Sequence, residues 1–448
     1  MGKVIKKICA MILICSLFIL CKENSLVFAS EKVTNIDILV RNKGDLEYVS
    51  RKLSGINSQI EVTEIPEIGL LRVQGINTNE LYHILSAPEI ADKISHTGNL
   101  ATIEQDPQLL SNEDKNIISR SYSKSRSGEV LSNEELFDEL AWHVDLVTNE
   151  RNSLEKATGQ GVKIAVIDSG IDKDHPILID KVDLSNAESF VENDSDIKDT
   201  NGHGTMVSGI IAQISPDATI TPYRVISESS GDSLWSIQAI IEAVNDGNEV
   251  INMSLGTYKD LDVEDEMLTV EAFERAIEYA SENKVPIVAS SGNNALNLDD
   301  YYETDHIKHL PGGMSGVITV SSVHNNLLAS YSNYGTNIML SAPGGDLVFV
   351  DGMLDLRNWI YCICPTYMDN GLSSVGIPQG YTYSYGTSLS APQVTAGIAD
   401  VIEYYALQGE ERMDAVSYLE NSAEDIGTIG VDIEFGYGML DVDAALGD

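Results

Sequence analysis

The stretch Gly386-Thr387-Ser388-Leu389-Ser390-Ala391-Pro392 carries the most information about the fold and chemistry of this 448-residue chain. Apolar residues behind it recur at helical spacing (Val394, Ile398 and Val401), which predicts that Ser388 lies at the start of a helix. The first turn of a helix leaves backbone N–H groups unpaired and carries a partial positive charge. A serine there can attack a carbonyl carbon while its own N–H stabilises the oxyanion. A serine at a helix start is more often only an N-cap, so this interpretation depends on companion motifs.

Two further motifs supply an acid and a base. The apolar run from Val162 to Ile167 is typical of a buried strand and ends at Asp168-Ser169-Gly170, and Asn201-Gly202-His203-Gly204-Thr205 precedes another helical pattern. Taken singly, each is weak, because many parallel strands end in aspartate and Gly-His-Gly is usually a tight turn. Together, Asp168, His203 and Ser388 give an acid, a base and a nucleophile, spaced 35 and 185 residues apart.

With these motifs the chain resembles the subtilisin-like serine proteases (subtilases, peptidase family S8), whose triad has the same chain order. The resemblance runs from about Gly161 to Asp441. It implies that Ser388 is the nucleophile, that His203 is the general base, and that Asp168 orients the imidazole. It also implies that Asn293 is the oxyanion-hole amide, although a loop asparagine is ordinarily a turn residue.

The same resemblance implies that the substrate binds as an extended strand between two edges. The residues expected to line these edges are Gly231 on one side and Ser254, Leu255 and Gly256 on the other. Asp299 and Asp300 follow Asn293 closely and are candidates for negative charge in a pocket for a basic side chain. The alternative is that both are solvated loop carboxylates.

The amino-terminal 29 residues predict a secretory signal peptide. Lys3, Lys6 and Lys7 precede an apolar stretch from Ile8 to Leu20, and small residues predict cleavage after Ala29. The stretch is too short to predict a stable membrane anchor. We therefore expect a secreted, extracellular protein.

Cysteine usage favours a bacterial source for this export. Three of the five cysteines lie within the predicted signal peptide, and Cys362 and Cys364 are too close together for a usual structural disulfide. An exported protein without a disulfide framework fits a bacterium better than a eukaryotic secretory route.

Residues 30–110 predict a small α+β module in the order β-α-β-β-α-β, which suggests a ferredoxin-like fold. The expected elements are a strand from Ile36, a helix from Leu46, strands at Ile60 and Leu70, a helix capped by Asn77 or Thr78, and a last strand from Leu100 to Ile103. The family resemblance implies a propeptide that assists folding and blocks the cleft. An unrelated accessory domain is the alternative.

Residues 111–132 are polar and rich in serine, which predicts an exposed linker. Arg120 and Arg126 each precede a serine and are the expected processing sites. The remaining residues, 133–448, alternate strand-like and helical runs. This predicts a doubly wound α/β peptidase domain with a mostly parallel sheet.

The formal net charge of −41 excludes nucleic acid as an expected partner, because no basic patch offsets phosphate repulsion. We expect a monomer whose partners are a peptide substrate and its own propeptide, and whose chemistry needs no metal or cofactor. Between Gln213 and Ile220 the chain lacks the asparagine-rich excursion that holds calcium in well-known subtilisins, although structural calcium can bind elsewhere. His306 and His309 are expected to be surface histidines.

Three segments resemble, more narrowly, the subtilases that remove leader peptides from lantibiotics. They are Tyr223-Arg224-Val225, the stretch from Val244 to Tyr258, and Trp142 with Val147-Thr148-Asn149. The resemblance implies a secreted endopeptidase that cuts a thioether-bridged bacteriocin precursor. The alternatives are a broad-specificity extracellular degradative subtilisin and an exported binding protein on an inactive protease scaffold.

Overall fold

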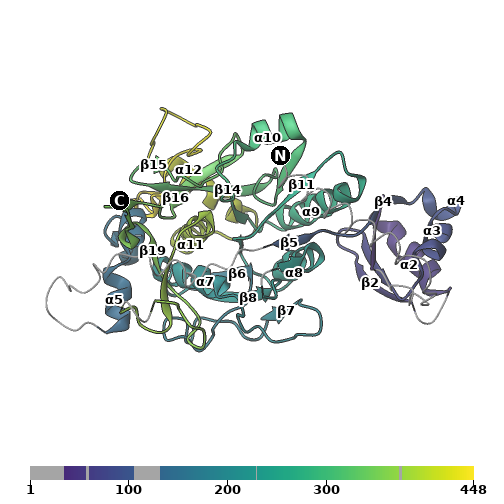
Figure 1. Ribbon diagram of the computed structural model, residues 1–448, viewed down its shortest axis with the longest axis horizontal. Coiled ribbons are helices and arrows are strands. Elements are labelled where there is room, and N and C mark those ends of the chain that lie inside the picture. Colours follow the sequence, from purple (N-terminus) through teal and green to yellow (C-terminus); the bar gives the residue numbers. More distant parts are fainter. Residues whose placement is uncertain (1–34, 57–59, 105–131, 229, 373–375, 448) are drawn as a thin grey trace, which may run out of the picture.

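The computed structural model describes residues 35–56, 60–104, 132–228, 230–372 and 376–447 (Figure 1). The predicted signal peptide, and with it Ala29, lies outside these residues, as do Arg120 and Arg126. The described chain forms a small N-terminal module and a larger α/β body, joined through the short strand β5.

The N-terminal module is a four-stranded antiparallel sheet in the order β2-β3-β1-β4. Its apolar core is its own and includes Ile38, Val49 and Leu71. The side chain of Asn77 accepts a hydrogen bond from Asn79 N and caps α3, as one of the two expected caps. The elements are β1 Ile36–Val40, α2 Leu46–Ser54, β2 Glu61–Ile65, β3 Leu70–Gln74, α3 Thr78–Leu85, α4 Pro88–Ala91 and β4 Ile94–Gly98.

The expected last strand of this module, Leu100 to Ile103, was wrong. The fourth strand is β4, and β5 (Thr102–Glu104) pairs with β9 (Ser230–Asp232) of the larger body. The apolar side chains of Leu100 and Ile103 gave the strand-like signal, but they are buried against the body. A pattern of apolar residues reports burial and not the partner that covers it.

The larger body is built on a twisted sheet in the order β15-β14-β12-β10-β6-β8-β7, with β16 beside β14. All pairings in this sheet are parallel except that of β14 with β15. This confirms the mostly parallel sheet. The strands are β6 Lys163–Asp168, β7 Glu188–Ser189, β8 Thr219–Arg224, β10 Val250–Met253, β12 Ile287–Ser290, β14 Val317–His324, β15 Leu327–Leu328 and β16 Ile338–Pro343.

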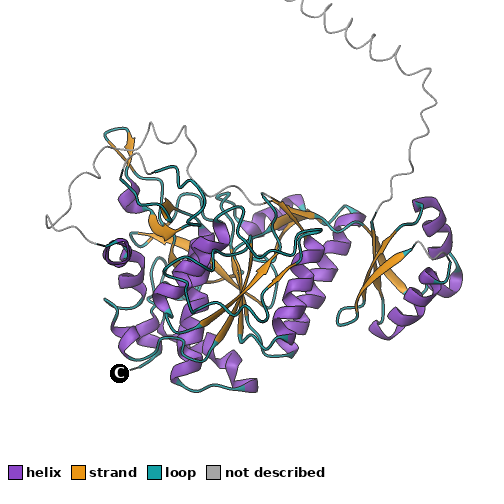
Figure 2. Cartoon of the chain, turned by 90° about the horizontal axis from the view of Figure 1, so that it is seen from below, coloured by secondary structure: helices purple, strands orange, loops and turns teal. Residues whose placement is uncertain are grey.

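Helices cover both faces of this sheet because successive side chains of a strand point to opposite sides (Figure 2). In β6, Ile164 and Val166 join the apolar cluster of α7 and α11, whereas Ala165 and Ile167 join that of α8 and α9. The near-continuous apolar run of β6 is therefore what a doubly covered strand requires. These helices are α7 His203–Ile214, α8 Ser233–Asn245, α9 Glu264–Glu282 and α11 Thr387–Tyr404.

The remaining elements lie around this sandwich. A capping box at Ser132 and Glu135 starts α5, and two antiparallel pairs, β11 with β13 and β19 with β20, project from the body. Their bounds are α5 Asn133–Glu139, α6 Trp142–Val147, β11 Thr257–Asp260, α10 Leu298–Asp305, β13 Ile307–Leu310, β17 Phe349–Val350, β18 Met353–Leu354, β19 Ile360–Ile363, β20 Tyr381–Ser384, α12 Asp414–Ser422 and α13 Val442–Ala445.

Two of the buried histidines of this body, His143 and His309, have strongly lowered pKa values. The expectation of a surface position was wrong for His309, which is only 4% exposed and packs against Tyr258 and Gly256. Burial lowers the pKa of His309 to about 4. His143 on α6 is fully buried, and burial together with the charge of Arg151 lowers its pKa to about 3.

These shifts predict a pH-dependent loss of stability. Below pH 6.5 the unfolded chain protonates His143 and the folded chain does not, so the contribution to stability is present above pH 6.5 and is lost as the pH falls towards 3. We expect His143→Leu to reduce the slope of unfolding free energy against pH by about 1.4 kcal/mol per pH unit. Denaturant unfolding in a Ser388→Ala background, which prevents self-digestion, measures this. Parallel slopes for parent and variant would contradict it.

Candidate active site

Asp168 ends the buried strand β6 and is 1% exposed. Its main-chain carbonyl accepts a hydrogen bond from Val225 N at 2.8 Å, which holds the strand end in the sheet. Its side-chain Oδ1 accepts one from Ser169 N at 2.7 Å. The position agrees with the general placement of active sites at the carboxyl ends of parallel strands.

His203 is the first residue of α7 and is 1% exposed. Its Nδ1 lies 2.9 Å from both carboxylate oxygens of Asp168. Because an ionised carboxylate can only accept, this pairing puts the ring proton on Nδ1 and leaves the Nε2 lone pair to take a proton. The close approach of the two segments requires glycine, since a Cβ on Gly204 would lie 2.2 Å from the Gly170 carbonyl oxygen.

Ser388 is the second residue of α11, which packs against α7. Its carbonyl oxygen accepts a hydrogen bond from Ser254 Oγ at 2.8 Å, and Ser254 in turn accepts one from Asn252 Nδ2. These bonds tie the start of α11 to the end of β10. Ser254, predicted to contact substrate, thus also anchors the nucleophile's helix.

Asn293 lies across a small space from Ser388. Its Oδ1 accepts hydrogen bonds from Thr387 N and Thr387 Oγ1, both at 2.9 Å, which leaves its Nδ2 as a donor. A Cβ added to Gly386 would lie 3.2 Å from Ser388 Oγ and 3.3 Å from Asn293 Nδ2. The two polar atoms therefore face one volume, and only a glycine at 386, with φ 143°, keeps it open.

The predicted substrate edge at Gly231 is occupied. In β9, Gly231 pairs antiparallel with Ile103 of β5, with Thr102 opposite Asp232 and Glu104 opposite Ser230. The opposite edge, Leu255 and Gly256 after Ser254, follows the end of β10. A chain segment following the N-terminal module thus lies where an extended peptide is expected.

The other predicted specificity residues lie on α10, whose cap Asn297 accepts hydrogen bonds from both Asp299 N and Asp300 N. The carboxylate of Asp299 accepts bonds from Thr336 N and Thr336 Oγ1 at 2.8 and 2.7 Å. Asp300 is exposed. Their role in binding a basic side chain stays a prediction.

Two contributors to the site were missed in the sequence. Thr387 fixes Asn293, and its hydroxyl also accepts a hydrogen bond from Gly292 N. Asp199, four residues before His203, is a buried carboxylate that binds both segments that carry the predicted acid and base. The Asp-Thr-Asn-Gly-His spacing was a visible signal, since a carboxylate just before a helix start is a natural acceptor for its free N–H groups.

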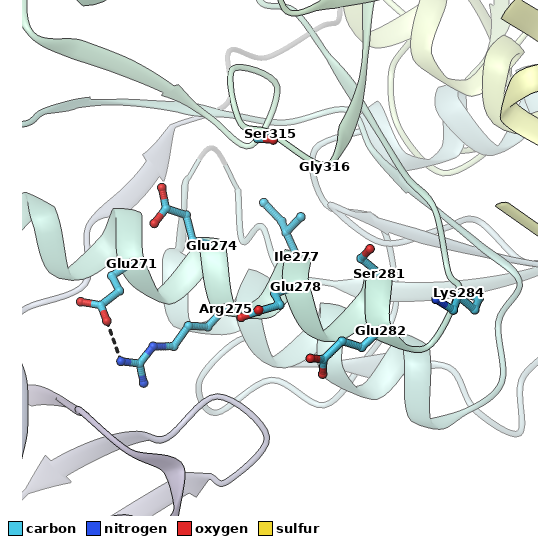
Figure 3. Close-up of a pocket in the computed structure, with 10 residues that line it drawn as sticks. All are labelled: Glu271, Glu274, Arg275, Ile277, Glu278, Ser281, Glu282, Lys284, Ser315 and Gly316. Atoms are coloured by element: carbon cyan, nitrogen blue, oxygen red, sulfur yellow. Dashed lines mark hydrogen bonds and ion pairs between the residues drawn. The ribbon is translucent and has the colours of Figure 1, made fainter. Parts of the chain in front are cut away.

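A pocket of about 640 Å³ lies along α9, away from these residues (Figure 3). Four of its ten lining residues are glutamates of the helix, two others are basic, and Ser315 and Gly316 face the helix. None of the predicted catalytic residues lines it. Glu271 and Arg275, at one end of its lining, also contact the N-terminal module.

Within the described ranges, no group of three or more histidine, cysteine or acidic side chains is arranged to hold a metal ion. The same part of the chain contains no helix with the length and apolarity needed to cross a membrane.

The Subtilase family, Peptidase_S8, matches residues 159–438. The match covers more than half of the chain and includes all four predicted chemical residues, so the chain belongs to the subtilase family. It is a serine endopeptidase of the subtilisin class.

Several proteins of this class are similar to the chain in sequence and in structure. The solved structure of a lanthipeptide protease is 35% identical and covers 70% of this chain and 97% of its own, with a TM-score of 0.67. The epidermin leader peptide-processing serine protease EpiP of Staphylococcus epidermidis is 28% identical over 330 residues, which are 64% of this chain and 70% of EpiP. The structure of EpiP from Staphylococcus aureus is 25% identical and covers 93% of this chain and 98% of its own, with a TM-score of 0.74.

Replacing Asn293 tests the predicted oxyanion site. We expect Asn293→Ala to lower kcat by about 10²–10³-fold with little change in KM. The magnitude is taken from the loss that the corresponding change causes in subtilisin. The Nδ2 donor meets negative charge that develops only after attack, so ground-state binding should not depend on it. Steady-state kinetics on one peptide substrate measures both constants. A loss confined to KM would show that Asn293 binds substrate instead.

Proposed function

We propose that this chain is a secreted serine endopeptidase that removes the leader peptide from a lantibiotic-type bacteriocin precursor. The observation that carries the proposal is the similarity to a lanthipeptide protease over 97% of that chain, together with the likeness to EpiP over most of this one. The predicted signal peptide supports secretion.

The chemistry we propose uses Asp168, His203, Ser388 and Asn293. Ser388 Oγ attacks the scissile carbonyl carbon while His203 Nε2 takes the hydroxyl proton. The Asn293 amide and the Ser388 N–H stabilise the oxyanion, and the amine leaves with the proton from His203. Water then repeats the sequence on the acyl-enzyme. The buried hydrogen bond between Asp168 and His203 supports this assignment because it orients the ring, with Nε2 left to take the proton. No metal or cofactor is needed for these steps.

We propose in addition that the N-terminal module is a propeptide that keeps the enzyme latent. The pairing of β5 with β9 supports this, because it uses the main-chain groups that a substrate strand would use. Ile103 is fully buried in the cluster of α8 and α9. Two main-chain hydrogen bonds of Ala101 also hold this segment on the body: its N–H donates to Thr269 Oγ1, and its carbonyl oxygen accepts from Ser233 N.

A buried arginine joins the module to the edge of the cleft. Arg72 of β3 donates to both carboxylate oxygens of Asp37, at 2.7 and 2.8 Å, and to both of Asp232, at 2.7 and 3.2 Å. The side chains of Arg72 and Asp37 are 8% and 0% exposed. Asp232 is also the N-cap of α8 and directly follows Gly231. Loss of the module would leave this carboxylate without its guanidinium.

A second polar contact reaches α9. Arg275 donates to the main-chain oxygens of Val40 and Ile68, both at 2.8 Å. Glu271 accepts a hydrogen bond from Arg275 within α9 (Figure 3). It accepts another from Ser95 of the module. Polar contacts are only one part of this interface, since apolar side chains of the module, Ile68 among them, are buried in the cluster of α8 and α9.

Cleavage of a precursor peptide tests the substrate. We expect one cut, at the junction of leader and thioether-bridged core, at a kcat/KM at least about 100-fold above that for unrelated casein peptides, a difference of about 2.7 kcal/mol in transition-state binding. Mass mapping of the products identifies the bond. Ser388→Ala should bind the precursor and cut neither substrate. Comparable rates on precursor and casein would favour the degradative alternative.

Inhibition in trans tests the module. Because it has its own apolar core, residues 30–110 can be added as a separate inhibitor of the peptidase domain. We expect Arg72→Ala to raise its inhibition constant at least about 30-fold, since truncating a buried charge pair leaves the partner carboxylates unpaired.

Two variants control this measurement. Arg51→Ala removes an exposed pair with Glu47, whose side chains are 73% and 83% exposed, and should change inhibition by less than about twofold. Asp232→Asn in the peptidase leaves the module intact and keeps an N-cap acceptor, yet should also weaken inhibition. Full inhibition of Asp232→Asn would exclude the proposed role of the ion pair.

A further inference from the structure

A buried carboxylate lies beneath the predicted catalytic pair. Asp199 is 0% exposed and precedes the first turn of α7. Its Oδ1 accepts hydrogen bonds from Ser169 Oγ at 2.9 Å, Asn201 N at 3.0 Å and Gly202 N at 2.7 Å. Its Oδ2 accepts two more, from Thr205 N at 2.9 Å and Thr205 Oγ1 at 2.7 Å. Five donors therefore converge on one side chain.

These donors belong to the two segments that carry the acid and the base. Ser169 directly follows Asp168, whereas Gly202 and Thr205 flank His203. Ser169 Oγ also accepts a hydrogen bond from Gly204 N at 2.9 Å. The carboxylate and this hydroxyl thus form a continuous bridge from the end of β6 to the start of α7, alongside the bond between Asp168 and His203.

A carboxylate suits this position better than any neutral side chain. All five partners donate, and an ionised carboxylate offers two oxygens that only accept. Burial raises the pKa of Asp199, and the hydrogen bonds from Thr205 and Gly202 act against that rise. Negative charge at the start of α7 is further favoured by the helix dipole.

We propose that Asp199 is a positioning residue, which fixes the separation and orientation of the Asp168 carboxylate and the His203 ring for proton transfer. The inference rests on the proposed roles of Asp168 and His203. Asp199 itself contacts neither the reacting atoms nor the substrate edge. Its effect on the reaction passes through the rigid placement of the two groups that do.

The isosteric change Asp199→Asn tests this placement. The amide keeps the shape but presents an NH₂ group to at least one donor, so the bridge must open on one side. We expect kcat per active site to fall about 10- to 100-fold, while KM stays within about twofold of the parent value. This is the loss expected when catalytic groups are misplaced by up to about 1 Å. Each variant is freed of its N-terminal module by the same added protease, and active sites are counted with a serine-directed phosphonate.

Asp400→Asn is the matched control. Asp400 is likewise 0% exposed and accepts from Ser215 Oγ at 2.7 Å, but it lies on α11, twelve residues beyond Ser388. Over twelve residues a helix rises about 18 Å, so the variant should lose stability without changing kcat per active site. An equal loss of kcat in both variants would show that Asp199→Asn acts by general destabilisation and would overturn the proposal.

A second variant keeps the test decisive should Asp199→Asn fail to fold. Ser169→Ala removes one donor and the link to Gly204 N but leaves four hydrogen bonds on Asp199. We expect kcat to fall about 3- to 10-fold at unchanged KM, and the effects of Ser169→Ala and Asp199→Asn to combine to less than their product, because both open the same bridge. The low-field NMR resonance of the His203 Nδ1 proton should weaken or move in each. Unchanged kcat and resonance in Ser169→Ala would overturn the proposal.

Failure of this inference can be told apart from failure of the proposed chemistry. His203→Ala and Ser388→Ala should abolish cleavage whatever Asp199 does. If they do and Asp199→Asn retains full kcat, only the positioning role is excluded. If they do not, the triad assignment is wrong and the role of Asp199 falls with it.

Discussion

The active-site geometry depends on the contact between the turn after β6 and the first turn of α7. Two segments 35 residues apart meet there, and the hydrogen bond from His203 to Asp168 is possible only because glycine at 170 and 204 lets the backbones approach. Burial makes the contact demanding, since each polar group taken from water needs a partner. Asp199 and Ser169 supply those partners. The polar network is therefore a condition of the fold as much as of the chemistry.

Buried charged groups need partners at the interface with the N-terminal module as well. In a chain of net charge −41, most carboxylates are solvated, but Asp37 is buried and Asp232 is largely covered, and one guanidinium serves both. Such an arrangement contributes specificity of docking more than stability, because the desolvation of three charged groups offsets most of their attraction. In the proposed propeptide role, the pairing of β5 with β9 would occupy the substrate edge, and the ion pair would make this docking specific to the module.

Sequence reasoning succeeded where the signal is local or a motif has a fixed order. The apolar run from Val162 to Ile167 located β6, and the motifs around Asp168, His203 and Ser388 led to the family that the comparisons show. It failed where a partner is remote. Nothing around Arg72 points to Asp232, 160 residues away, and the run at Leu100 gave the right burial but the wrong sheet. The burial of His309 was missed because it depends on β11 and on the glycines packed against its ring.

The same contrast between local signals and remote partners applies to the residues of the site. The predicted catalytic residues could be named from the sequence because the chemistry restricts their type. The residues that hold them could not, because several side chains could accept or donate at each place. Thr387 and Asp199 belong to this second group. Thr387, at the start of α11, donates from its N–H and its hydroxyl to Asn293, whereas Asp199 accepts from N–H groups at the start of α7. A helix start leaves several donors without helical partners, so a site placed between the starts of α7 and α11 must recruit acceptors from nearby loops. If the proposed roles hold, the need for a positioning residue follows from placing the base and the nucleophile at helix N-termini. The Ser388 N–H proposed for the oxyanion and the N–H groups bound by Asp199 are then both unpaired donors of a helix start.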